Sequence, residues 1–207
     1  MHTSYNRRTA TKIKDGRVQR KNRHVPTGKL GCIIDRESPG RGFRHVLTKN
    51  DVQEFLSIIP DRDILIEGLE RIILARNDEE THCDGYYLFY HREETGGVFL
   101  HAWREDLWAE IETGYFESHE EIFTILGVSF DRSNGGIMCR FTEAQARAFM
   151  LLHVLMHELG HHYDRRRQKH RHSSRGEDYA ERFANTRFYE LYARYVNVFG
   201  NPAREEN

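Results

Sequence analysis

Cysteine, proline and long apolar runs are all scarce in this 207-residue chain, and each scarcity excludes a class of protein. The cysteines, Cys32, Cys83 and Cys139, are odd in number, far apart and free of any Cys-x-x-Cys pair. They predict neither a disulfide framework nor a thiolate metal site, and they suit a reducing compartment. No stretch approaches the roughly 20 apolar residues that cross a bilayer. Residues 1–29 lack the apolar core of a signal peptide, so we expect a cytoplasmic protein with no membrane partner.

Charged residues are plentiful and nearly balanced, because they make up 30% of the chain yet leave a net charge of -1 at pH 7. A hydrophobic fraction of 38% is typical of a globular protein, and 207 residues suit one core rather than two. Residues 1–29 are the exception, since nine lysines and arginines there face one acidic residue, Asp15. We predict a basic, flexible arm over residues 1–29 and one folded domain over residues 30–207.

The first half of the folded domain has the patterns of short strands. Residues 30–34 and 71–75 are apolar runs of strand length. Residues 86–90 and 98–103 are rich in aromatic and β-branched side chains and flank a Thr-Gly-Gly turn at residues 95–97, which predicts a hairpin. We therefore expect a small, mainly antiparallel sheet.

Capping signals predict helices. Thr48 or Asn50 can cap a helix that reaches about Ile59. The capping box Ser-His-Glu-Glu at residues 118–121 predicts a second helix that ends before Gly127.

The second half of the domain predicts longer helices. A further capping box at residues 142–145 opens a periodic segment with no glycine or proline before Gly160. A polar, basic loop over residues 166–176 leads to a final helix over residues 177–199. Strands first and helices last are typical of an α+β domain, with a long helix and a C-terminal helix after the sheet.

The pentapeptide HELGH at residues 157–161 has the spacing of a zinc site. His157 and His161 lie one turn apart on a helix face, so both imidazoles can reach one Zn²⁺ ion. Glu158 is rotated about 100° round the helix, where its carboxylate can take a proton from a water that the metal activates. These roles, two metal ligands and one general base, predict hydrolysis of a carbonyl compound.

A catalytic zinc usually has three protein ligands, so a third is needed. Glu177 and Glu181 are the candidates, because the last helix can return to the metal if it packs antiparallel to the first. Only one of them need bind, and the other can accept a hydrogen bond from a ligand histidine. His153 is expected to lie in the core or the pocket wall, His162 to be solvated or to pack, and Asp164 to support a ligand histidine or the helix end.

The two motifs together resemble those of a known family. HELGH, followed by EDYAERFA at residues 177–184, is similar to the gluzincin branch of zincin metallopeptidases, and most of all to the ImmA/IrrE-type family. The resemblance covers residues 142–199 and implies a zincin-like fold, a Zn²⁺ cofactor and a protein or peptide substrate. In the family the leading glutamate of the second motif binds zinc, which makes Glu177 the third ligand. The chain departs from the family pattern at Glu181, where the family has asparagine.

Some assignments stay open under this resemblance. Aligned with the Glu-Gly-Phe-Ala motif of aminopeptidases, the chain would use Glu181 as the ligand. Zincins pair the substrate backbone with a strand at the sheet edge, for which residues 98–103 are the candidate. Gluzincins often steady the oxyanion with a tyrosine or histidine, and the sequence offers four tyrosines without choosing among them: Tyr163, Tyr179, Tyr189 and Tyr192.

The sequence therefore predicts a zinc-dependent metallopeptidase. An alternative is a nucleic-acid-associated protein with conditional or lost protease activity, in which the arm over residues 1–29 and the basic loop over residues 165–175 bind nucleic acid or another acidic partner. A binding module that keeps the zinc fold without turnover is a third, which the intact Glu158 disfavours.

Overall fold

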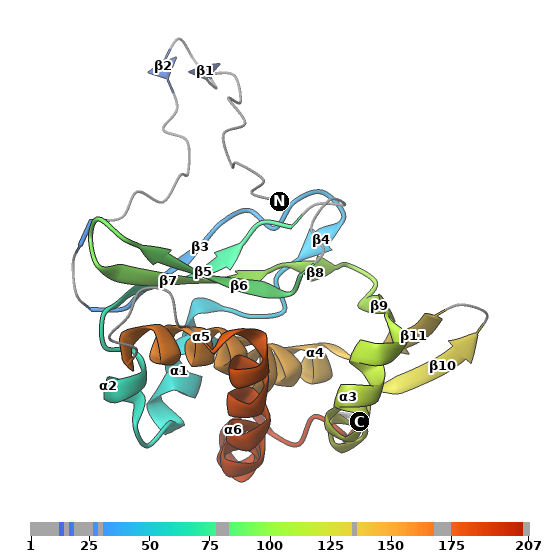
Figure 1. The fold of residues 1–207 in the computed structure, drawn as a ribbon. Coiled ribbons are helices and arrows are strands. Elements are labelled where there is room, and N and C mark those ends of the chain that lie inside the picture. Colours follow the sequence, from blue (N-terminus) through green and yellow to red (C-terminus); the bar gives the residue numbers. More distant parts are fainter. Residues whose placement is uncertain are drawn as a thin grey trace.

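In the computed structural model, a layer of helices packs against one face of a four-stranded sheet (Figure 1). The structure describes residues 13–14, 17–18, 27–28, 31–77, 83–133, 136–167 and 175–204. Most of the predicted basic arm, residues 1–29, lies outside these ranges. Within it, β1 (Ile13–Lys14) pairs with β2 (Arg17–Val18) in antiparallel orientation.

The main sheet has the strand order β3-β5-β7-β6. Its strands are β3 (Ile33–Arg36), β5 (Leu69–Ala75), β7 (Thr95–His101) and β6 (Gly85–Tyr90). β3 pairs with β5 and β5 with β7 in parallel, and only β6 and β7 are antiparallel. The prediction of a mainly antiparallel sheet is wrong for this sheet, because helices α1 (Lys49–Ile58) and α2 (Arg62–Leu65) form a crossover between β3 and β5.

The predicted hairpin exists, but its turn lies elsewhere. Thr95, Gly96 and Gly97 belong to β7, and the connection from β6 is residues 91–94. A Cβ on Gly96 would lie 2.7 Å from Cε2 of Tyr87. The glycine therefore allows a ring from β6 to lie close over the backbone of β7, which explains why a turn-forming residue lies inside a strand.

Two smaller sheets join the main sheet to the rest of the domain. β4 (Phe43–Arg44) pairs with β8 (Trp103–Arg104). A three-stranded antiparallel sheet, in the order β10-β11-β9, contains β9 (Trp108–Ile111), β10 (Ser129–Ser133) and β11 (Gly136–Arg140). Both are absent from the sequence-based prediction, since their strands have at most five residues.

Two predicted helix signals have different outcomes. Of the two predicted caps, Thr48 and Asn50, the structure uses Thr48, which caps α1 through a complete capping box. α3 (Thr113–Leu126) begins five residues before the predicted cap and ends at Gly127, which adopts the left-handed conformation. The hydroxyl of Ser118 donates to the carbonyl of Tyr115 at 2.9 Å within the helix, so its short polar side chain is used for a local bond other than the cap.

The long periodic segment is one helical rod with a π-helical middle. It consists of α4 (Glu143–Phe149), the π-helix η1 (Met150–Leu155) and α5 (Met156–Arg167), and Thr142 caps it as predicted. The last helix, α6 (Gly176–Phe199), contacts η1 and α5. The structure is thus mixed α+β, with small sheets and helices. No helix among the described residues combines the length and apolarity needed to cross a membrane.

Candidate metal centre

His157, His161 and Glu177 come together where α6 starts. One carboxylate oxygen of Glu177, Oε2, lies 3.1 Å from Nε2 of His157 and 3.4 Å from Nε2 of His161. Tetrahedral zinc with bonds of about 2.0–2.1 Å sets its ligand atoms about 3.3 Å apart. The two nitrogen ligands, the carboxylate oxygen and the distances between them therefore fit a zinc ion. The side chain of Glu177 is 82% exposed to solvent.

The approach of α6 to α5 depends on Gly160. A Cβ at this position would lie 3.2 Å from Cα of Ala180 and 3.1 Å from Cδ1 of Phe183. The missing side chain of Gly160 leaves room for a neighbouring element, and that neighbour is α6. Close contact here places the first turn of α6 beside the two histidines.

Asp164 fixes the start of α6. Its carboxylate is 2% exposed and accepts hydrogen bonds from the backbone amide of Arg175 at 2.7 Å and from Nε of Arg175 at 2.6 Å. The end of α5 is thereby tied to the residue that precedes α6. Because Glu177 follows two residues later, Asp164 acts on the centre through helix placement.

Glu181 lies on the other side of the His157 ring. Its Oε2 is 3.2 Å from Nδ1 of His157, whereas Glu177 faces Nε2. A carboxylate at Nδ1 selects the tautomer that leaves Nε2 free for a metal, and it orients the ring. Of the two registers that the sequence allowed, this placement fits Glu177 as ligand and Glu181 as its hydrogen-bonding partner.

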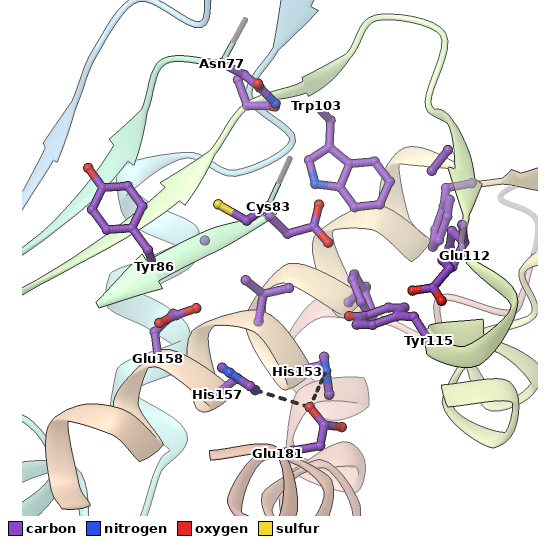
Figure 2. A pocket seen from close by; sticks show the side chains of 18 of the residues that line it. Asn77, Cys83, Tyr86, Trp103, Glu112, Tyr115, His153, His157, Glu158 and Glu181 are labelled. Carbon is purple, nitrogen blue, oxygen red and sulfur yellow. Dashed lines mark hydrogen bonds and ion pairs between the residues drawn. The ribbon is translucent and has the colours of Figure 1, made fainter. Parts of the chain in front are cut away.

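Glu158 lies beside His157 at the edge of the sheet (Figure 2). Its side chain is buried, and burial raises the pKa of this carboxyl to about 7, although the nearby His157 and a backbone hydrogen bond from Tyr87 lower it. A group with this pKa can both accept and release a proton near neutral pH.

Burial and the neighbouring carboxylates have opposite effects on the pKa of His157. Burial lowers the pKa of its imidazole, but the neighbouring Glu181, Glu158 and Glu177 outweigh burial and raise it. For His161, burial wins and the pKa falls. The centre is therefore an anionic environment that attracts a cation.

An open cleft of about 1180 Å³ lies in front of these residues. Figure 2 shows its wall on one side formed by the edge strand β6 and on the other by Tyr115 and the β9 segment. Six carboxylates line it and one arginine, Arg104; the carboxylates are Asp84, Glu110, Glu112, Glu158, Glu177 and Glu181. The cleft is thus acidic.

The strand at the edge of the main sheet is β6. The predicted edge segment, residues 98–103, is wrong, because β7 is paired on both sides, with β5 and β6. A Cβ on Gly85 would lie 3.4 Å from Cγ of Glu158, so β6 passes directly along the helix that carries the motif. The resemblance to zincins predicts that an edge strand lies beside the motif helix, but it does not identify which strand of this chain is at the edge.

None of the four tyrosines suggested by the sequence lines the cleft. Tyr163 and Tyr179 pack against Phe183, Tyr192 donates to a backbone carbonyl of α3, and Tyr189 is 51% exposed. The tyrosines that do line it are Tyr86, Tyr87 and Tyr115.

The remaining histidines include one that the sequence analysis missed. His153 is buried, as expected; His162, expected to be either solvated or packed, is buried and lies 2.9 Å from the carbonyl oxygen of Glu67. The sequence predicts no role for His119, which lies on α3, yet its Nε2 lies 2.8 Å from Oε1 of Glu181. Glu181 follows His119 by 62 positions in the sequence, so no local pattern relates them.

The chain matches no protein-family model, no curated protein and no solved structure. The likeness to zincins consequently depends on the two motifs in the sequence and on the geometry of the residues they contain.

Proposed function

We propose that the protein is a zinc-dependent metallopeptidase with a zincin-like fold, in which His157, His161 and Glu177 bind Zn²⁺. One observation carries the proposal. The Nε2 atoms of both histidines face one carboxylate oxygen of Glu177, and the buried Glu158 lies next to them in an open cleft. This is the donor set and the base of a hydrolytic zinc site.

Glu158 is the general base in this proposal. Zinc, when bound, polarises the scissile carbonyl and makes water acidic enough to attack near neutral pH. Glu158 takes the proton of the attacking water and passes it to the leaving amine nitrogen. Burial raises the pKa of this carboxyl, which helps it to hold the proton between the two transfers.

The edge strand supports an extended peptide as substrate. β6 has one pairing partner, β7, and its other edge lines the cleft through Gly85, Tyr86 and Tyr87. A peptide can add to this edge by backbone hydrogen bonds while its scissile bond lies over the centre. The acidic walls favour peptides with basic side chains over acidic ones.

The nucleic-acid alternative has less support. Each described arginine of residues 165–175 has a partner within the chain: Arg165 lies over Phe89, Arg166 pairs with Glu67, Arg167 lies over Tyr163, and Arg175 pairs with Asp164. Residues 168–174 and most of the arm lie outside the described residues. The acidic cleft would repel a phosphate backbone.

Metal analysis and a substitution of the base test the proposed function. Purified protein is expected to contain zinc and to cleave members of a peptide library, and a chelator should abolish cleavage until zinc is restored. Glu158→Gln should keep the zinc and lose about 10²–10⁴-fold in cleavage rate. Glu112→Gln, on the cleft wall, is the matched control and should keep most of the activity. Absence of bound metal, or full activity of Glu158→Gln, contradicts the proposal.

A further inference from the structure

A second group of potential ligands surrounds Glu181. His119 from α3 and His153 from η1 lie at its two carboxylate oxygens, at 2.8 Å and 3.8 Å. Both histidines are at most 3% exposed. Their ligand atoms and that of Glu181 lie within 4.8 Å of one another, as in the group of His157, His161 and Glu177.

The proton positions of His119 leave an electrostatic conflict. Its Nδ1 lies 2.6 Å from the carbonyl oxygen of Tyr115, which has no hydrogen to give, so Nδ1 must carry the proton. When the ring carries this one proton, the lone pair of Nε2 faces a carboxylate oxygen of Glu181 at 2.8 Å. Two electron-rich atoms at this distance repel each other unless a second proton on the ring or a metal cation lies between or beside them.

Nε2 of His119 is a buried atom without a hydrogen-bond partner. It lies 2.8 Å from Oε1 of Glu181, and this contact is an ion pair only when the ring carries a second proton. A proton bond between nitrogen and oxygen needs near-linear alignment, whereas a metal ion accepts lone pairs that converge at an angle.

Unsatisfied polar atoms are concentrated here. Among the described residues, seven buried side-chain nitrogen or oxygen atoms have no hydrogen-bond partner, and three of these belong to neighbours of Glu181: His119 Nε2, His153 Nδ1 and Asn185 Oδ1. Asn185 also donates to Glu181 through Nδ2, at 3.1 Å. Such a concentration is expected where a group other than protein completes the site.

We infer that His119, His153 and Glu181 form a second divalent-cation site beside the proposed catalytic centre. Two imidazole nitrogens and one carboxylate favour Zn²⁺, or Co²⁺ as its substitute, over Mg²⁺ or Ca²⁺, which prefer oxygen ligands. A cation can enter from the cleft, because His153 and Glu181 line it.

The proposed second site connects three helices and shares Glu181 with the surroundings of the proposed catalytic centre. His119, His153 and Glu181 come from α3, η1 and α6, so a bound cation would cross-link them. Figure 2 shows His153 and His157 both directed at Glu181. Because Glu181 also contacts Nδ1 of His157, the second cation would hold the carboxylate that orients a proposed catalytic ligand. The π-helical turn that presents His153 agrees with the frequent occurrence of such turns at functional sites.

Zinc stoichiometry tests the inference independently of the proposed function. The full-length protein is stripped of metal, titrated with ZnCl₂ against a colorimetric chelator, and analysed for zinc after gel filtration. We expect two equivalents in the wild type, one in His119→Gln or His153→Gln, and one in the double variant His161→Gln, Glu177→Gln. His161 and Glu177 are partly and largely exposed, so the double variant should fold even if His119→Gln or His153→Gln does not. It then still shows whether a zinc ion binds away from His161 and Glu177.

Each outcome decides between the two sites. One equivalent in the wild type that is lost in His161→Gln, Glu177→Gln overturns the second site and leaves the proposed function intact. If the wild type binds one equivalent of zinc that is kept in His161→Gln, Glu177→Gln and lost in His119→Gln, the second site is supported and the proposed catalytic ligands are contradicted. No binding at all overturns both.

Discussion

Gly160→Ala is the most direct test of how the centre is assembled. The added Cβ would lie 3.1 Å from Cδ1 and 3.3 Å from Cβ of Phe183, and 3.2 Å from Cα of Ala180. Two of these atoms are fixed to the backbone of α6, so the helix must move by a few tenths of an ångström. Glu177 lies on the same helix, less than one turn before Ala180, and moves with it.

The expected change in stability is a sum of two effects. Extra volume in a tight contact costs about 1–3 kcal/mol. Replacing a helical glycine with alanine contributes about 1 kcal/mol in the opposite direction. The free energy of unfolding should therefore fall by about 1 kcal/mol, and zinc affinity should fall with it if Glu177 is a ligand.

Gly114→Ala in α3 is the matched control. A Cβ there would meet one atom within 4 Å, Oε1 of Glu112 at 3.6 Å, so this variant gains helix propensity without a clash. Urea unfolding should show Gly114→Ala equal to or up to about 1 kcal/mol more stable than wild type, and Gly160→Ala less stable. If Gly160→Ala were stabilised as much as the control, close packing of α5 and α6 would not be what places the centre.

Three further substitutions test the surroundings of the centre. Glu181→Gln replaces the carboxylate at Nδ1 of His157 with a neutral amide and should lower the zinc affinity of the His157, His161 and Glu177 site about 10–100-fold, measured by chelator competition in a His119→Gln background; unchanged affinity would refute this role. Asp164→Asn weakens the bonds to Arg175 and should reduce the free energy of unfolding by about 1–3 kcal/mol in urea, and equal stability would argue against the tie between α5 and α6. For Glu70, burial raises the carboxyl pKa but four hydrogen bonds outweigh it, so the pKa lies below its ordinary 4.5. The resulting stabilisation is present above that value and lost as pH falls through the folded-state pKa. As pH falls from 5 to 3, the free energy of unfolding should therefore decrease more steeply in the wild type than in Glu70→Gln. Equal slopes in the two proteins would contradict the lowered pKa of Glu70.

The features predicted correctly from the sequence depend on contacts within a few residues. Thr48 and Thr142 cap their helices, and Gly127 ends α3, because each acts on backbone groups of its own helical turn. The spacing of His157 and His161 places them on one helix face for the same reason. Strand segments were located within a few residues by their apolar content.

The errors concern strand neighbours and turns. Parallel pairing of β5 with both β3 and β7 depends on how the crossover packs, which the strands' own residues do not encode. Gly96 and Gly97 match a turn signal, yet they lie in a strand because tyrosine rings from β6 lie over them. The edge strand was misplaced because pairing on each side is a property of the sheet.

The sequence by itself determined the chemistry of the proposed centre: a helix with two histidines and a glutamate, followed by a second helix with two candidate carboxylates. Only the tertiary structure decided that Glu177 faces Nε2 of His157 while Glu181 faces Nδ1, and that His119 reaches Glu181 from α3. The physical reason is the range of the interactions. Helical spacing relates neighbours within one turn, whereas the side of an imidazole that a distant carboxylate meets is set by how closely two helices pack, here across Gly160.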